Sequence, residues 1–430
     1  SGQCTCSGGG TPENGVTAQE DTAAETIPFE GKIITEGGNY EIPEGKYAGN
    51  ITVNLTDTSE PVNIAIKGGI TYNGKQQVMF ILVKNADEVT ITNDGHEVNC
   101  APAVAHFLDV YSGNVTVNGG TYVTDKRNLV MAYAGTTTLN DMTTETSGYA
   151  VTSSGSAKVV VNRGTHTHSN TNQDRANFWI FNGGHMTLND VVATSEEAVI
   201  LNSDSTVNVN GGDFKTTGTK SCFVNNSANL TINKGSTTEG NFVSEGASCI
   251  NNSWGQVRIN GGSFTTDAGI AVKNRGGLRL NGGTVEAPNG GTAIDISGES
   301  GDVQLNGGTI RNSVTGVRVA DAGDSEIDLK AVTFENNTDD ISLGNDQQIN
   351  IKKSFVGTAK IRVDDPARGR QITTDNEDSP YQKELNLISR NEGYVIGYKK
   401  VTDGAEFRYL APANGNIVTA ENAKATADLG

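Results

Sequence analysis

A short phrase recurs along this chain: an apolar residue, any residue, an apolar residue and Asn, often followed by two glycines. Clear copies end at Asn118, Asn210 and Asn260, and degenerate copies lie between them. The complete series is Asn118, Asn140, Asn162, Asn189, Asn210, Asn233, Asn260, Asn281 and Asn306, with gaps of 21 to 27 residues. One short strand at such a period is typical of a solenoid, in which each turn of chain stacks on the one before. The repeat therefore predicts stacked coils over most of the chain.

Two further strands are expected in each coil. An apolar run such as FWIFNGG (178–184) precedes each marked strand, and a shorter run such as GTYVT (120–124) follows it. Three strands per coil, each parallel to its copies above and below, make a parallel β-helix, and strand twist favours the right-handed form. We expect an all-β, right-handed, single-stranded parallel β-helix of about 12–13 coils over residues 29–359.

The recurring Asn has a structural explanation. Asn tolerates the left-handed backbone of a turn, and the Gly that follows tolerates it better still. When one Asn is stacked per coil, each carboxamide can donate to one neighbour and accept from the other. We therefore expect an Asn ladder along the helix.

The sequence changes character outside the repeat. Residues 1–28 hold almost no apolar side chains, which predicts a flexible N-terminal tail. Residues 360–410 contain β-rich runs separated by polar turns, and we interpret them as a cap over strand edges that would otherwise invite aggregation. Residues 411–430 are polar and predict a tail or linker.

Charge and composition narrow the possible partners. The formal net charge of −18 repels phosphate backbones, so we expect no nucleic acid partner. Acidic loops would suit a bound Ca²⁺ ion, and no other cofactor is expected. No stretch of 18 apolar residues exists, so we expect no transmembrane segment. A surface rich in Asn, Thr, Ser and Gly indicates an extracellular or cell-surface location.

Two of the five cysteines fall at equivalent places in neighbouring coils. Cys222 and Cys249 each lie 11 residues before a ladder Asn. Stacked strands are about 4.8 Å apart, which is within reach of a disulfide. Buried thiols are the favoured alternative, because small core cysteines are common.

The strand before each marked one has unusual outward residues. Aligned on its inward positions, one outward column is Asp109, Met131, Val151, Trp179, Ile200, Phe223, Cys249, Ala271, Asp295 and Arg318. A second column is Tyr111, Tyr133, Ser153 and Phe181, followed by Asn202, Asn225 and Asn251. Outward apolar side chains need a cover. The cover is either the protein's own loops, tail or cap, or a sugar or protein partner for which Trp179, Phe181, Tyr111 and Tyr133 form an aromatic floor.

A local basic cluster stands out in this acidic chain. Arg258 and Arg279 occupy the same outward position on neighbouring coils. Arginines grip carboxylates through paired hydrogen bonds, so this row could bind an acidic sugar. The alternative is neutralisation by nearby acids such as Asp267, Glu286 and Asp302.

Three of the five histidines fall in one coil. His166 and His168 are two apart on a strand, so both point to the same side. With Asp174 from the following loop they are a candidate transition-metal site. The favoured interpretation is a solvated polar loop without a metal.

The coils resemble the pectin-lyase-like superfamily of right-handed parallel β-helices, and especially the repeat-rich surface proteins of gut bacteria, over residues 60–355. The polygalacturonase-type motif Asn-Thr-Asp has a match in letters at 337–339, but no Gly-His-Gly follows. For the lyase type, which needs clustered Asp for Ca²⁺ and a basic residue, the nearest approach is Asp295, Arg318 and Asp321. The resemblance implies the fold and leaves catalysis in question.

These observations give two functional hypotheses. The first is a secreted or cell-surface bacterial protein without catalysis, acting in adhesion or glycan binding, with a carbohydrate or a host or cell-surface protein as partner. The second is a polysaccharide lyase or glycoside hydrolase that acts on acidic polysaccharide in a groove along the helix. An enzyme should gather two or three acids and an Arg in an open cleft, whereas a binding protein should present an aromatic or apolar strip.

Overall fold

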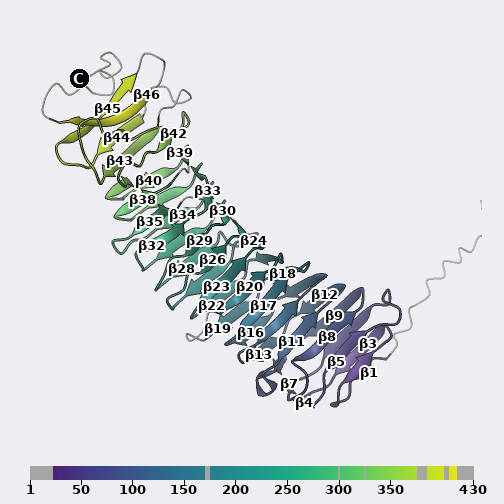
Figure 1. Cartoon of the computed structure of the whole chain (residues 1–430). Coiled ribbons are helices and arrows are strands. Elements are labelled where there is room, and N and C mark those ends of the chain that lie inside the picture. Colours follow the sequence, from purple (N-terminus) through teal and green to yellow (C-terminus); the bar gives the residue numbers. More distant parts are fainter. Residues whose placement is uncertain are drawn as a thin grey trace, which may run out of the picture.

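The computed structural model describes residues 23–169, 175–298, 301–323, 326–374, 385–400 and 406–413. It is all-β, a right-handed parallel β-helix of about 14 turns, slightly longer than the expected 12–13. Figure 1 shows the coils stacked into one elongated body. Within the described residues, the one helical element is a short 3₁₀ turn, η1 (Ala101–Ala103).

Three parallel sheets form the sides of the helix. Sheet A has 15 strands from β1 (Glu25–Thr26) to β42 (Asn350–Ile351), and sheet C has 13 from β4 (Gly45–Tyr47) to β40 (Thr333–Glu335). Sheet B has 16 strands, from β2 (Lys32–Ile34) to β44 (Leu385–Ser389). One coil contributes a strand to each sheet in the order B, A, C, as the sequence predicts. The recurring Asn closes the sheet A strand.

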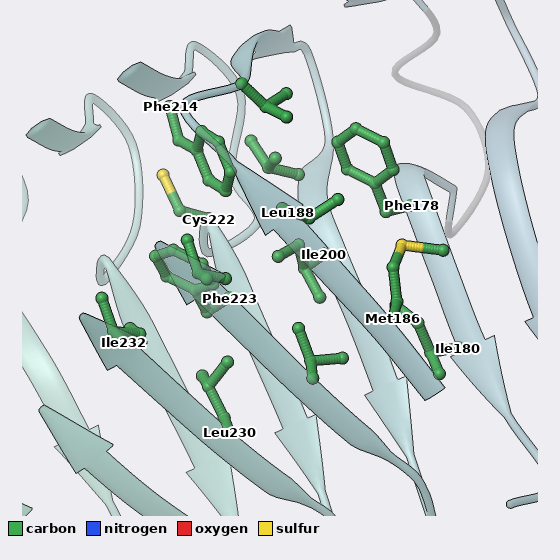
Figure 2. Close-up of a cluster of buried hydrophobic side chains, with 14 of the residues drawn as sticks. Phe178, Ile180, Met186, Leu188, Ile200, Phe214, Cys222, Phe223, Leu230 and Ile232 are labelled. Atoms are coloured by element: carbon green, nitrogen blue, oxygen red, sulfur yellow. The ribbon is translucent and has the colours of Figure 1, made fainter. Parts of the chain in front are cut away.

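A thin apolar core fills the space between the three sheets. In one coil the alternating residues Phe178 and Ile180 of β20 (Ala176–Phe181) and Met186 and Leu188 of β21 (His185–Asn189) point inward and are fully buried. Figure 2 shows these side chains meeting their counterparts from the next coils. Every second residue of a strand faces the core, so short strands suffice to build it.

The Asn ladder is present and continuous. Each ladder Asn donates its side-chain amide to the side-chain oxygen of the ladder Asn one coil earlier. The eight bonds join all nine residues from Asn118 to Asn306, with N···O distances of 2.7 to 2.9 Å. The ladder prediction is confirmed.

A second, inner Asn ladder was not expected. Asn202 donates to Asn225, Asn225 to Asn252, and Asn252 to Asn274, at 2.7 to 2.9 Å, and all four side chains are buried. The prediction placed Asn202 and Asn225 in an outward column with Asn251, which is wrong. They close sheet B strands from the inside and satisfy carbonyl groups of the turn, such as that of Ala228 at 2.8 Å.

The ends of the helix differ from the expected boundaries. Parallel pairing begins at Glu25, inside the segment 1–28. At the other end β43 (Gly357–Val363) and β44 extend sheet B into the segment 360–410. An antiparallel hairpin, β45 (Tyr394–Lys400) and β46 (Glu406–Pro412), follows β44 at the end of the stack (Figure 1). The segments 1–22 and 414–430 lie outside the described residues.

The two equivalent cysteines are free thiols in the core. Cys222 and Cys249 lie on neighbouring coils, where the Phe223 amide donates to the Cys249 carbonyl. The Cys222 thiol lies 3.0 Å from the Val243 carbonyl oxygen, and the Cys249 thiol lies 3.1 Å from that of Thr265. Burial raises the pKa of Cys222 to about 12. The favoured prediction of buried thiols is confirmed.

Candidate functional site on the outer face of sheet B

The outward column of sheet B is only partly the predicted one. Strand register gives Asp109, Met131, Thr152, Trp179, Leu201, Val224, Asn251, Lys273, Asp295 and Arg318. The predicted members Val151, Ile200, Phe223, Cys249 and Ala271 face the core and are fully buried. A slip of one residue moves a side chain to the other face, and the turns that enter these strands differ in length from coil to coil. The corrected outward column still contains three adjacent apolar residues, Trp179, Leu201 and Val224.

An aromatic stack occupies the middle of this face. The rings of Trp179 and Phe181, both on β20, stack with centroids 4.0 Å apart, and Tyr149 stacks on Trp179 at 4.9 Å. Tyr149 lies on the neighbouring strand β17 (Tyr149–Ser154). Tyr149 is buried, while Trp179 and Phe181 remain half-buried. The stack therefore presents partly exposed aromatic rings on the outer face of sheet B.

The tyrosine part of the predicted floor forms a separate stack. Tyr111 and Tyr133 follow β11 (His106–Val110) and β14 (Asn128–Ala132), and their rings stack at 4.5 Å. Between this pair and Phe181 the same outward column holds Ser154. Desolvation is the main cause that raises the pKa of Tyr133 to about 12. The four predicted aromatic residues thus share one face but belong to two stacks.

A groove adjoins the Trp179 stack. Its floor is Leu201 of β23 (Ala198–Ser203), Val224 of β26 (Phe223–Asn226) and Asn251 of β29 (Ile250–Ser253). The remaining lining residues are Arg175, Ala198, Thr219, Lys220 and Ser221, and the groove encloses about 460 Å³. We call this feature the sheet B groove.

The groove is apolar below and cationic at its rim. Leu201 and Val224 pack with Trp179 against the buried Tyr149, Ala176 and Ala198, an apolar cluster outside the main core. The Arg175 guanidinium lies 5.1 Å from the centre of the Tyr149 ring, a cation–π contact. The described lining contains no carboxylate. This arrangement can bind a ligand through contact and polar bonds, and it lacks paired acids for hydrolysis.

A buried His–Asp hydrogen bond on the same face was missed in the sequence. His106 Nδ1 lies 2.6 Å from Asp109 Oδ1 on β11, and both side chains are nearly buried. Strand alternation places residues three apart on opposite faces, so the spacing gave no signal. The carboxylate fixes the orientation of the ring beneath the outer surface of sheet B.

The predicted basic row lies on a different side of the helix. Arg258 of β30 (Gln256–Ile259) and Arg279 of β33 (Gly277–Leu280) are direct partners in sheet A, and both are exposed. Their register is as predicted from the adjacent Asn marks. The structure does not bring them to the groove on sheet B.

The histidine pair faces the core and not a solvated loop. His166 and His168 of β19 (Thr165–His168) both point inward and are buried. His166 Nδ1 lies 2.7 Å from Thr144 Oγ1, and His168 Nδ1 lies 3.1 Å from Ser195 Oγ. Burial lowers the pKa of each histidine to about 4. Asp174 lies outside the described residues, and among the described ones no group of three His, Cys, Asp or Glu is placed to hold a metal.

The residues of the enzyme hypothesis are held by other partners. Asp295 and Arg318 are neighbours on sheet B, but Arg318 pairs with Asp364 at 2.5 Å and donates to Ser342 at 2.8 Å. Asp321 accepts from the Gly323 amide at 2.9 Å. Burial raises the pKa of Asp295. No ion pair joins Asp295 to Arg318 in the described structure.

The Asn-Thr-Asp match lies near the C-terminal end of the stack, where its acidic residue forms structural ion pairs. Asp339 pairs with Arg362 at 2.7 Å and with Arg390 at 3.2 Å. The following acid, Asp340, accepts the Lys360 amide at 2.8 Å. Both carboxylates are buried and bind the last coils together.

No family model, curated protein or solved structure matches this chain. The described part contains no helix long and apolar enough to cross a membrane. The functional interpretation of the candidate site therefore rests on its geometry.

Proposed function

We propose that this chain is a non-catalytic glycan-binding protein that uses the sheet B groove and the aromatic stack beside it. The observation that carries the proposal is the Trp179–Phe181 stack, with ring centroids 4.0 Å apart, at the side of a groove of about 460 Å³. An apolar surface with a few polar groups at its edge is the usual form of a ligand site. The site is held on strands, so little order has to be created on binding.

Sugars suit this surface better than a purely apolar ligand does. A pyranose ring has an apolar face of C–H groups that covers an aromatic ring, and hydroxyl groups at its rim that need polar partners. Trp179 supplies the ring, and Asn251, Thr219 and Ser221 supply amide and hydroxyl groups along the groove. Parallel strands stack one above another along the helix axis, so the surface is elongated in that direction, which favours an extended chain of sugars over a single one.

The residues available for catalysis favour binding over cleavage. Glycoside hydrolysis needs two carboxyl groups beside the scissile bond. The described lining of the groove has none, and Arg318, Asp339 and Asp321 are engaged elsewhere. We therefore place the lyase or hydrolase hypothesis second.

The cellular setting is part of the same proposal. A surface rich in Asn, Thr, Ser and Gly and the recurrent Asn-Gly-Gly phrase support a secreted or cell-surface bacterial protein of the pectin-lyase-like kind. In that setting the groove would act in adhesion, on a glycan of a host or neighbouring cell. A long solenoid presents such a site along an extended surface.

A glycan array tests the proposal, with Trp179→Ala and Leu201→Asp as the groove variants. Val192→Ala is the matched control, because Val192 is an exposed apolar residue of the same coil that points outward from sheet C, on β22 (Val192–Ser195). We expect binding by the parent and the control, and its loss in both groove variants, whose folding is checked by urea unfolding. No bound glycan, or equal binding by folded groove variants, would contradict the proposal.

A further inference from the structure

The turn that leads from sheet B to sheet A contains an unusual residue. Trp254 lies between β29 and β30 with φ of +63°, and 54% of it is exposed. Backbone hydrogen bonds align it with Ser227 and Asp204 of the two preceding coils, whose φ values are both +49°. Asp tolerates this left-handed conformation, whereas a bulky side chain is a genuine outlier there. A strained and exposed Trp is an observation that points to a function.

The equivalent turn of the next coil is shorter than the turn that holds Trp254. Register pairs Asn252 with Asn274 and Gln256 with Gly277, so the second turn is one residue shorter than the first. Arg275 of this shorter turn lies with its guanidinium 5.9 Å from the Trp254 ring centre. A cation–π contact at this distance holds an exposed ring and a charge in one orientation.

Two more cations lie on the sheet A strands that follow these two turns. Arg258 and Arg279 point outward from sheet A as direct cross-strand partners, and neither forms an ion pair with any described residue. Like charges placed opposite each other on neighbouring strands repel, at a spacing of about 4.8 Å. An anion between the two guanidinium groups would remove that repulsion and accept hydrogen bonds from both. Arg258 is four positions after Trp254, at most about 14 Å of extended chain.

We propose that Trp254, Arg275, Arg258 and Arg279, the basic corner, bind an anionic saccharide that carries sulfate or carboxylate groups. The indole covers a sugar ring, and the arginines bind its anionic substituents in the forked geometry that suits these groups. The basic corner is a second site on a different face from the sheet B groove. Its test is independent of the function proposed for the groove.

The overall charge makes this cluster selective. The chain has a formal net charge of −18, so most of its surface repels polyanions. A polyanion would meet attraction at the basic corner, where Arg258 and Arg279 form no ion pair with a described residue. An aromatic platform beside them adds a contact that a nucleic acid backbone or a free phosphate ion does not require, and it favours a sugar polymer.

Tryptophan fluorescence can report on this site alone. The chain has two Trp residues, so Trp179→Phe leaves Trp254 as the single reporter. We expect dextran sulfate, polygalacturonate or both to change its emission, and neutral dextran to leave it unchanged. The two anionic probes separate the sources of negative charge, because a response to sulfate, carboxylate or both supports the site and names its preference.

Charge variants give the decisive comparison in the same background. We expect Arg258→Gln with Arg279→Gln to weaken binding about tenfold or more, because charge-assisted bonds are lost. Lys84→Gln with Lys158→Gln removes the same charge from exposed positions elsewhere and should leave affinity within about twofold. No emission change with either anionic probe, a response to neutral dextran, or equal weakening by both pairs would overturn the proposal. Trp254→Ser in the parent chain removes the indole, and calorimetry with the anionic probe that gave the emission change should show loss of binding while the fold remains intact.

Discussion

Asn189 donates its side-chain amide to the side-chain oxygen of Asn162 at 2.8 Å, although 27 residues of chain separate them. The corresponding bond from Asn162 to Asn140 spans 22 residues at the same distance. The longer coil therefore does not disturb the ladder. This tolerance explains how coils of unequal length stack in one file.

The ladder should contribute measurably to stability. Asn189→Ala breaks a bond to each neighbour and leaves the Asn162 oxygen without its donor, so we expect the free energy of unfolding to fall by about 1–2 kcal/mol. Urea unfolding followed by circular dichroism measures the change. Asn208→Ala is the control, because Asn208 points outward from β24 (Thr206–Asn210) and should change stability by less than about 0.5 kcal/mol. Equal effects at the two positions would contradict the ladder's role.

The buried histidines should make stability depend on pH. His166 has a pKa lowered from 6.5 to about 4 by burial, so between these values the unfolded chain binds a proton that the folded chain does not. Its contribution is complete above pH 6.5 and is lost as the pH falls towards 4, by about 3 kcal/mol in all. We expect His166→Gln to make the pH dependence of the free energy of unfolding less steep over this range, with the contribution of His168 remaining.

A surface histidine provides the control for that experiment. His185 lies at the start of β21 and is exposed. Carboxylates contribute equally to the pH dependence of unfolding in the parent and in both variants. His185→Gln should therefore leave the slope of unfolding free energy against pH as it is in the parent. A slope in His166→Gln as steep as in the parent would show that His166 is not the cause.

The core thiols should react only when the protein unfolds. In a Cys4→Ser, Cys6→Ser background three cysteines remain, and Cys100, Cys222 and Cys249 are all buried and free. Burial and a raised pKa keep the reactive thiolate scarce. We expect no labelling by a thiol reagent in buffer and labelling of three thiols in denaturant without reductant. Labelling of only one would instead reveal a disulfide between Cys222 and Cys249.

Sequence reasoning succeeded where a residue type marks the register. The Asn at each sheet A strand end fixed the alignment of its neighbours, so Arg258 and Arg279 were placed correctly two residues away. The same mark failed on sheet B, where the entering turns vary in length and Leu201 and Val224 took the outward places assigned to Ile200 and Phe223. Apolar residues occupy both faces of these short strands, so alternation cannot show which side is the core.

The candidate site could not be predicted from local sequence patterns, because it depends on which strand face is buried and on which loops meet. Alternation correctly placed His166 and His168 on one side of their strand, but it could not say that this side faces the core. The sheet B groove is walled by Thr219, Lys220 and Arg175, which come from two different loops. Segments that meet only after coiling leave no local signature in the sequence.

The most direct test of the glycan-binding account uses Trp179 as the reporter. Trp254→Phe leaves it as the single Trp of the chain, half-buried beside the groove. Titration with an oligosaccharide selected on the array should shift and enhance its emission as the sugar covers the ring, with a midpoint that equals the calorimetric dissociation constant. Binding by calorimetry with unchanged Trp179 emission would place the ligand elsewhere and contradict the account.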